Sequence, residues 1–106
     1  MNERLAAILA ELRRRFDVLY GERLIRMVLF GSQARGDAES GSDIDVLVVL
    51  REPLSPCQEI ERTLDAVANI SLDFNEVVSC VFVSEEQFER EHSPLLMNVR
   101  REGVAI

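Results

Sequence analysis

Small, polar and acidic residues gather between two apolar runs near the middle of the chain. Residues 31–36 read GSQARG, and residues 42–45 read SDID. Because side chains at i and i+2 of a strand point to the same face, we expect Asp43 and Asp45 to project together. Two adjacent carboxylates repel each other but suit a hard cation, and Mg²⁺ typically takes one or two carboxylates together with substrate phosphates. Asp43 and Asp45 therefore form a candidate magnesium site.

The turn before these acids has the residue types that hold phosphate groups. Gly31 lets an anion approach the backbone closely. Ser32 offers a hydroxyl and, as an N-cap, would open a helical turn over residues 33–35 whose free N–H groups face an anion. Arg35 adds a charge-assisted contact to phosphate. A phosphate-binding turn beside two metal-binding acids predicts phosphoryl or nucleotidyl transfer.

The two motifs together resemble the signature of the polymerase-β-type nucleotidyltransferase superfamily, and the small size resembles its minimal nucleotidyltransferase (MNT) branch, known from HEPN–MNT toxin–antitoxin pairs. The resemblance implies the polymerase-β-like nucleotidyltransferase fold. This fold is of the α/β (α+β) class, with a small mixed β-sheet and helices packed mainly on one face. Mg²⁺ is the implied cofactor, and ATP or another NTP is the implied substrate.

The resemblance also implies roles for individual residues. Asp43 and Asp45 hold the metal and, with Arg35, form the catalytic set. Arg35 supports the phosphates or the acceptor. The implied nucleotide-binding residues are Gly31, Ser32, Arg35 and Ser42.

One position departs from the pattern of the superfamily. Active members carry a third carboxylate on the strand after the second long helix, where it helps to hold the metal and activates the attacking hydroxyl. The best local match places Ser79 there, and a hydroxyl is a far weaker ligand for a hard cation than a carboxylate. Glu76 could substitute only if a bulge intervenes or if the strand register is shifted by one residue, because its parity along the strand aims it at the opposite face.

Two functions therefore compete. In the first, the chain transfers a nucleoside monophosphate, with AMP from ATP as first choice, to an acceptor hydroxyl. The resemblance implies a tyrosine of a HEPN toxin as acceptor and an antitoxin role for this chain. In the second, the chain is a catalytically degenerate antitoxin or binding module that acts by forming a complex. Ser79 favours the second function, and the intact motif favours the first. A small-molecule acceptor ranks third, because we expect no extra domain to form its pocket.

Composition limits the class of protein. With 106 residues, we expect one domain over residues 1–106. The net charge of −7 argues against passive nucleic-acid binding, which depends largely on neutralising phosphates. We find neither an apolar run long enough to cross a membrane nor a signal peptide, so we expect a cytoplasmic protein.

Hydrophobic periodicity and capping residues predict the elements that position the motifs. The predicted elements are a helix from Asn2 to about Tyr20, strands at 24–30 and 44–50, a helix from Pro56 to 70–74, a strand at 76–83, a short helix after Ser84, a helix from Pro94 to Arg101 and an edge strand at 104–106. The loop at 37–41 is small and polar. The apolar stripe of the second long helix is predicted at Ile60, Leu64, Val67 and Ala68.

The face that carries the two acids is expected to be apolar farther along the strand. Leu47 and Val49 share the parity of Asp43 and Asp45, so they point to the same side. An apolar sheet face needs a cover. We expect a homo-oligomer mate or a separate HEPN-type helical protein to supply it.

Overall fold

The computed structural model describes residues 2–106, and its elements follow the predicted order. The elements are α1 (Glu3–Tyr20), a 3-10 turn η1 (Gly21–Arg23), β1 (Leu24–Phe30), α2 (Ser32–Arg35), β2 (Ile44–Leu50), α3 (Pro56–Phe74), β3 (Val78–Ser84), α4 (Glu85–Arg90), α5 (Pro94–Glu102) and β4 (Val104–Ala105). The predicted helices and strands are confirmed, with shifted ends: β3 spans 78–84 instead of 76–83, α5 ends one residue later and β4 one residue earlier than predicted.

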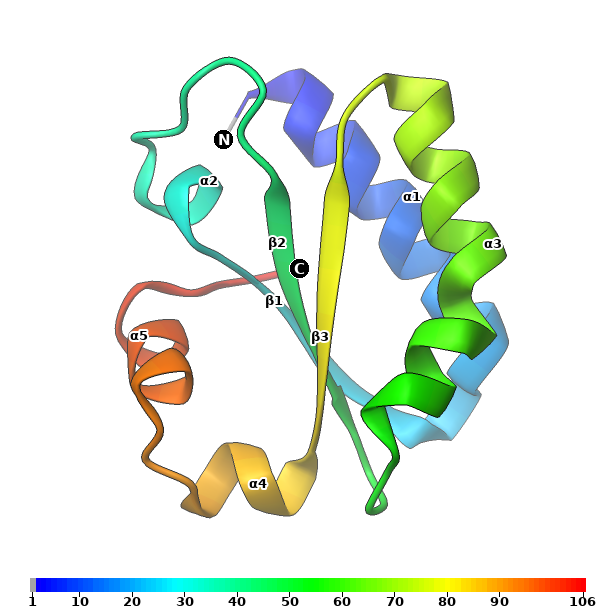
Figure 1. Cartoon of the computed structure of the whole chain (residues 1–106), viewed down its shortest axis with the longest axis vertical. Coiled ribbons are helices and arrows are strands. Elements are labelled where there is room, and N and C mark those ends of the chain that lie inside the picture. The colour runs from blue at the N-terminus through cyan, green and yellow to red at the C-terminus, as the bar shows by residue number, and fades with distance from the viewer. Residues whose placement is uncertain (1) are drawn as a thin grey trace.

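The four strands form one mixed sheet in the order β3-β2-β1-β4 (Figure 1). β1 runs antiparallel to both β2 and β4, whereas β2 and β3 are parallel. This arrangement confirms the mixed sheet of the predicted α+β class. Because β1 and β2 are antiparallel, the end of β1 meets the start of β2. The two sequence motifs lie at that meeting point.

The main core lies between the sheet and the two long helices. Alternate side chains of β2 point toward α1 and α3, and those of Val46 and Val48 are fully buried there. Leu12 and Phe16 of α1 are also fully buried, and Phe82 of β3 stacks on Phe16. Burying an aliphatic or aromatic side chain of this size contributes about 1.5–3 kcal/mol. This core holds β2, the strand that carries Asp45, in place.

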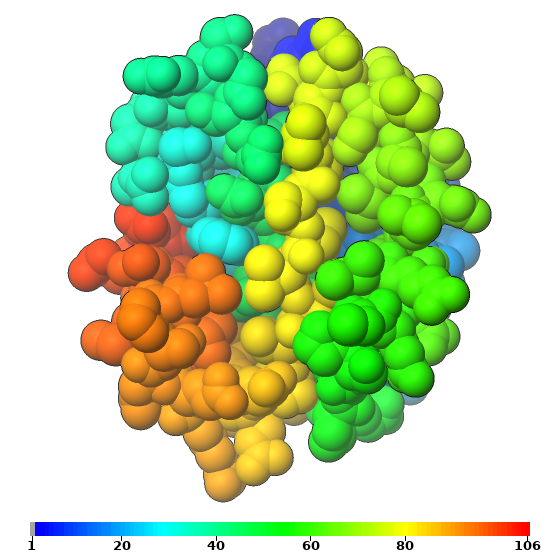
Figure 2. Space-filling model, in the orientation of Figure 1, coloured from blue at the N-terminus to red at the C-terminus, as the bar shows by residue number. Residues whose placement is uncertain are grey.

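The opposite face of the sheet is covered in part by the chain itself. Leu47 and Val49 pack with Leu96 and Val99 of α5, and all four are buried. The expectation that a second protein must cover these two residues is therefore wrong. Figure 2 shows α4 and α5 over the lower part of this face, with β3 visible at the surface beside them. The upper part of the face, where the motifs lie, is free of these two helices.

The apolar stripe predicted for α3 is wrong at Ile60, Leu64 and Ala68, whereas Val67 packs against the core as predicted. Ile60 and Leu64 are 50% and 57% exposed, whereas Glu59 and Thr63 face the interior. Helical spacing alone favoured the aliphatic residues, but the packing of α3 against α1 and β3 selects the neighbouring stripe. The buried stripe also includes Ile70, which is fully enclosed.

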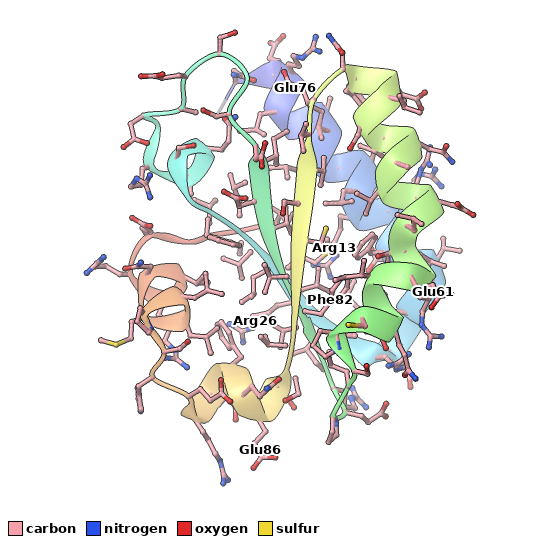
Figure 3. All side chains as sticks on the ribbon, in the orientation of Figure 1. Arg13, Arg26, Glu61, Glu76, Phe82 and Glu86 are labelled. Carbon is pink, nitrogen blue, oxygen red and sulfur yellow. The ribbon has the colours of Figure 1, made fainter. Side chains whose placement is uncertain are left out.

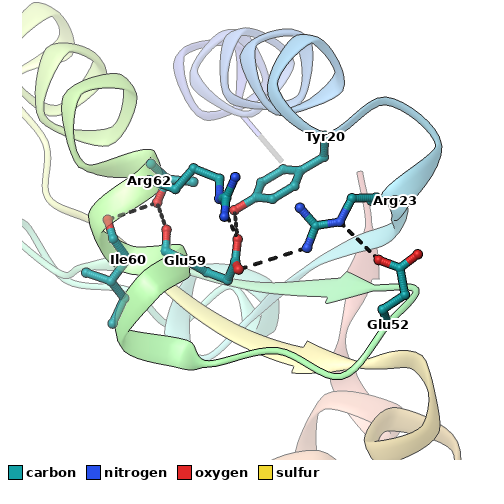
Figure 4. Close-up of polar contacts among 7 residues, drawn as sticks. Tyr20, Arg23, Glu52, Glu59, Ile60 and Arg62 are labelled. Atoms are coloured by element: carbon teal, nitrogen blue, oxygen red, sulfur yellow. Dashed lines mark hydrogen bonds and ion pairs between the residues drawn. The ribbon is translucent and has the colours of Figure 1, made fainter.

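Glu59 is buried because its charge is compensated by side chains from other elements (Figure 4). Its Oε1 accepts a hydrogen bond from the Tyr20 hydroxyl at 2.8 Å and lies 3.1 Å from Nε of Arg62. Its Oε2 lies 3.9 Å from Nη2 of Arg23, which in turn pairs with Glu52. We call these five residues the Glu59 cluster. It ties the end of α1 to the start of α3, away from the two motifs.

Polar side chains cap the starts of three helices. Asn2 accepts a hydrogen bond from the N–H of Leu5 at 2.7 Å. Ser84 and Gln87 form a capping box at the start of α4, and Ser93 caps α5 through the N–H of Leu96. Such caps stabilise a helix by about 1 kcal/mol each. Within residues 2–106, no helix has both the length and the apolar character needed to cross a membrane.

Candidate nucleotide and metal site

The pairing of β1 with β2 brings the glycine turn against the acidic pair. Phe30, the last residue of β1, lies opposite Asp45 in the antiparallel ladder. Gly31 follows directly and turns the chain into α2, so this turn and the start of β2 share one corner of the sheet (Figure 1). The sequence predicted both parts of this corner, and the structure brings them together.

Gly31 is required here by two independent features. Its backbone has φ 75° and ψ −158°, a region that is essentially restricted to glycine. A Cβ atom at this position would lie 2.5 Å from Oδ2 of Asp45. The missing side chain therefore makes room for the Asp45 carboxylate, in addition to letting an anion approach the backbone.

α2 is a single turn that begins one residue earlier than the sequence suggested. Gly31 is its N-cap, so the expectation that Ser32 is the N-cap is wrong. The carbonyl of Gly31 accepts from the N–H groups of Ala34 and Arg35, both at 3.1 Å. The N–H groups of Ser32 and Gln33 precede these and have no acceptor within the helix. They are the donors that this turn can offer to a phosphate.

The two acids lie in different surroundings. Asp43 is exposed in the loop before β2, whereas Asp45 is half-buried within the strand. Burial raises the pKa of Asp45 above its ordinary value, and the negative charge of Asp43 raises it further, whereas Arg35 acts in the opposite direction. A cation at this place would relieve the repulsion between the two carboxylates. The site therefore attracts positive charge before any ligand binds.

The donor set fits Mg²⁺ if substrate oxygens complete its coordination. Two carboxylates combined with phosphates and water are a usual environment for this ion, which is seldom held by protein ligands alone. Among residues 2–106, no group of three or more His, Cys, Asp and Glu side chains could hold a metal. If Mg²⁺ binds at this corner, Asp43 and Asp45 would hold it together with a bound nucleotide.

Ser79 lies beside Asp45, as its sequence position predicts. The two residues are paired in the parallel ladder of β2 and β3, and paired residues project to the same face of a sheet. Ser79 is half-buried. The structure therefore puts a hydroxyl next to the acidic pair, where the superfamily pattern has a carboxylate.

Glu76 is not brought to this corner. It lies two residues before β3, and its carboxylate is 3.5 Å from Nε of Arg4 on α1 (Figure 3). α1 covers the opposite face of the sheet from the one toward which Asp45 projects. No bulge is recorded in the ladder between β2 and β3. Glu76 thus has the orientation that strand parity predicts.

Arg35 and Ser42 border the acidic pair but are engaged elsewhere. Nε of Arg35 lies 3.1 Å from Oδ2 of Asp37, and its Nη1 lies 3.2 Å from Oε1 of Glu102. The Ser42 hydroxyl accepts a hydrogen bond from the N–H of Glu39 at 3.0 Å and closes a turn in the loop. Glu102 could not be predicted as a partner of Arg35, because nothing in the local sequence pattern links the end of α5 to α2.

The sequence model of the nucleotidyltransferase domain matches residues 7–101. This chain belongs to the nucleotidyltransferase family. The type of reaction that goes with this family, and so with this chain, is nucleotidyl transfer. A similar sequence is MJ0141 of Methanocaldococcus jannaschii, described as a candidate protein adenylyltransferase. The two are 31% identical over 72 residues, which cover 68% of this chain and 72% of MJ0141.

Solved structures show that this nucleotidyltransferase has the minimal form of the fold. A candidate minimal nucleotidyltransferase superposes with a TM-score of 0.60 at 22% identity, covering 96% of this chain and 95% of the other. A chain from the structure of a tri-AMPylated Shewanella oneidensis HEPN toxin in complex with MNT antitoxin gives a TM-score of 0.55 at 15% identity, covering 92% and 70%. These likenesses confirm the predicted polymerase-β-like nucleotidyltransferase fold.

Proposed function

We propose that this nucleotidyltransferase binds ATP with Mg²⁺ and transfers AMP to a hydroxyl group of a partner protein. The observation that carries the proposal is the position of the Gly31 turn against Asp45, fixed by the pairing of β1 with β2. This corner combines backbone donors for phosphate with carboxylates for a cation. We further propose that residues 1–106 form a single domain and that the reaction takes place in the cytoplasm.

We propose a separate role for each residue at this corner of the sheet. Asp43 and Asp45 hold the cation, and the N–H groups of Ser32 and Gln33 donate to the outer phosphates. Gly31 keeps the backbone accessible, and Arg35 supports the phosphates once it leaves its carboxylate partners. When bound, Mg²⁺ neutralises the phosphate charge and stabilises charge that develops during transfer.

The loop that contains Ser42 borders the same ligand. Because its hydroxyl accepts from the N–H of Glu39, we propose that Ser42 acts on the nucleotide by shaping this loop.

A protein acceptor is supported by the similar proteins. The described activity of MJ0141 is protein adenylylation, and the toxin in the Shewanella oneidensis complex carries AMP groups. We therefore propose a HEPN-type helical protein as the partner, with a hydroxyl side chain such as tyrosine as the acceptor. This chain would then act as the antitoxin. A homo-oligomer is a further assembly that we propose to test.

A second function is favoured by one observation. Ser79 lies where a third carboxylate would complete the site, so transfer can be slow or absent while nucleotide and partner still bind. In that case, the chain neutralises its partner by forming a complex. The two functions make opposite predictions for the acidic pair, because only transfer requires a bound cation.

The deciding experiment follows label from α-labelled ATP in the presence of Mg²⁺ and the product of the neighbouring gene, as the candidate partner. Label on the partner would support transfer if it is lost with Asp43→Asn/Asp45→Asn but kept with Asp65→Asn, a change at an exposed residue of α3. A stable complex without label, equally stable with the double variant, would support binding alone. If the partner is not labelled and no complex forms, both functions are contradicted.

A further inference from the structure

Arg35, the last residue of α2, is held by two carboxylates from different parts of the chain. Asp37 follows it closely in the loop, and Glu102 comes from the far end of the chain. The two pairs use different guanidinium nitrogens, Nε and Nη1, so both can form at once. They raise the pKa of Arg35 above its ordinary value, so the guanidinium stays charged. We call this three-residue contact the Arg35 clasp.

Glu102 occupies a place that helix electrostatics disfavours. It is the last residue of α5, where the helix dipole favours cations over carboxylates. Its side chain is nevertheless only 21% exposed, whereas that of Arg35 is 44% exposed. Arg35 supplies the positive charge that this position needs. The contact is thus a specific pairing between α5 and α2.

The backbone around Glu102 is held firmly on both sides. Val99, one turn earlier, is buried against the sheet. Gly103 follows, packed so closely that a Cβ there would lie 2.5 Å from Cγ1 of Val28. Val104 then pairs with Leu29 of β1. Glu102 is therefore anchored, and Arg35, on a long and exposed side chain, is the partner that can move.

The charges of this corner oppose the approach of a nucleotide. The guanidinium of Arg35 pairs with Asp37 and Glu102 and acts on the charge of Asp45, which is also repelled by Asp43. A triphosphate is strongly anionic, and a cation on the acidic pair offsets only part of the repulsion. Arg35 is a positive charge at this corner, and the clasp already occupies it.

We propose that Glu102 is a positioning residue that sets nucleotide affinity by holding Arg35, so that a phosphate must displace this carboxylate to recruit the arginine. The inference rests on the proposed function, because it concerns the same nucleotide site. Exposed ion pairs are weak, and an arginine fork pairs well with phosphate oxygens, so the exchange is favourable once the nucleotide arrives. Glu102 thereby lowers the affinity for any nucleotide whose phosphates bind Arg35.

The test measures binding of ATP with Mg²⁺ by calorimetry to the wild-type chain and to Glu102→Gln. We expect the Kd to fall about two- to fivefold in the variant, the factor by which an exposed ion pair typically changes an equilibrium. Asp37→Asn removes the other carboxylate from an exposed loop, leaves α5 untouched and should act in the same direction. Glu91→Gln, at the end of α4, is the matched control for loss of one negative charge and should leave the Kd unchanged.

A double-mutant cycle separates an effect through Arg35 from a change in overall charge. In the Arg35→Gln background, Glu102→Gln should no longer change the Kd, because there is no arginine to release. Any one of three results would overturn the inference but not the proposed function. These are an unchanged or higher Kd in Glu102→Gln, an equal fall of the Kd in Glu91→Gln, and an effect of Glu102→Gln that persists without Arg35. If neither the wild-type chain nor Glu102→Gln binds any nucleoside triphosphate, the inference and the proposed function both fail.

Discussion

The carboxylate of Asp45 is half-buried beside a second carboxylate, an arrangement that works against the stability of the free protein. Burial and Asp43 both raise its pKa. A carboxyl group whose pKa is higher in the folded state than in the unfolded state destabilises the fold when it ionises. The cost therefore begins as the pH rises through the ordinary value of 3.8 and remains at neutral pH. Binding residues often carry such a cost because function requires them.

Asp45→Asn should therefore stabilise the protein while removing a metal ligand. Without divalent cations at pH 7, we expect a gain in unfolding free energy of about 0.5–1 kcal/mol, and this gain should vanish below the ordinary pKa of Asp45. Added Mg²⁺ and ATP should raise the melting temperature of the wild-type chain but not of the variant. Thermal unfolding at several pH values provides the measurement, with Asp65→Asn as control. A loss of stability at pH 7 would contradict the prediction.

The contact between Gly31 and Asp45 can be tested with a second glycine as reference. Gly31→Ala should destabilise the protein by about 2–4 kcal/mol, because the new Cβ meets the Asp45 carboxylate and the backbone conformation is restricted to glycine. Gly36→Ala has a similar φ of 82° but open space around the added atom, so it should cost about 1–2 kcal/mol. Urea unfolding of both variants gives the comparison. Equal losses would show that the contact carries no cost of its own.

For single residues, the alternation of side chains along a strand (strand parity) predicted orientations that local motifs alone do not give. Parity correctly oriented Ser79 toward the acidic pair, since a two-residue period leaves little freedom in an unbulged strand. Glu76 also points away from the pair, but it lies before β3 and forms an ion pair with Arg4 of α1. The Arg35 clasp could not be predicted, because its two ends are 67 residues apart in sequence. Such a contact depends on how α5 docks on the sheet, and no local pattern encodes that docking.

Among the elements, α3 shows where hydrophobic periodicity fails. Its aliphatic residues Ile60 and Leu64 define one stripe, yet the helix buries Glu59 and Thr63 instead. The hydroxyl of Thr63 bonds to the carbonyl of Glu59 within the helix, and the Glu59 carboxylate finds partners outside it. A period of 3.6 residues identifies an amphipathic helix, but a charged residue with partners from another element can shift the buried face.

Tyr20→Phe should weaken the link between α1 and α3. The change removes the hydroxyl that donates to the buried Glu59 carboxylate, so we expect a loss of about 1–3 kcal/mol at pH 7. Burial, and after it Glu59, raises the pKa of Tyr20 above its ordinary value of 10.0, so wild-type stability should fall as the pH rises past that value.

The alkaline loss should be smaller in the variant, which has no group to ionise at this position. Urea unfolding of both proteins at pH 7 and near pH 10.5 measures the two effects. Burial also raises the pKa of the Cys80 thiol, to about 12, but both proteins share this group, so its contribution cancels in the comparison. Parallel pH profiles for the two proteins would contradict the assignment to Tyr20.

At the scale of the whole molecule, the point to test is whether a complete nucleotidyltransferase fold with two metal-binding acids instead of three performs nucleotidyl transfer. The parallel pairing of β2 and β3 puts Ser79 beside Asp45, so Ser79→Asp would restore the third carboxylate without moving a strand. We expect this variant to bind Mg²⁺ or Mn²⁺ at least about tenfold more tightly, because an added charge about 5 Å from a cation interacts by several kcal/mol at an effective dielectric constant near 20. Without metal, it should be less stable than the wild-type chain.

Transfer of label from ATP by Ser79→Asp then distinguishes the two proposed functions. Faster transfer than by the wild-type chain would show that the missing carboxylate limits catalysis. Ser79→Ala serves as the matched control and should leave metal affinity nearly unchanged. Unchanged metal affinity in Ser79→Asp would mean that the residue at this position does not reach the acidic pair.

The two acids differ in what holds them, and this difference limits how tightly a cation can bind. Asp45 is fixed in a central strand, whereas Asp43 closes a loop of small and polar residues that begins after α2. A cation bound by both must immobilise that loop, at an entropic cost of about 1–2 kcal/mol for each residue that loses its freedom. Loop length and glycine content between α2 and β2 therefore become adjustable determinants of affinity. Related chains with the same two acids can differ in metal requirement through this loop alone.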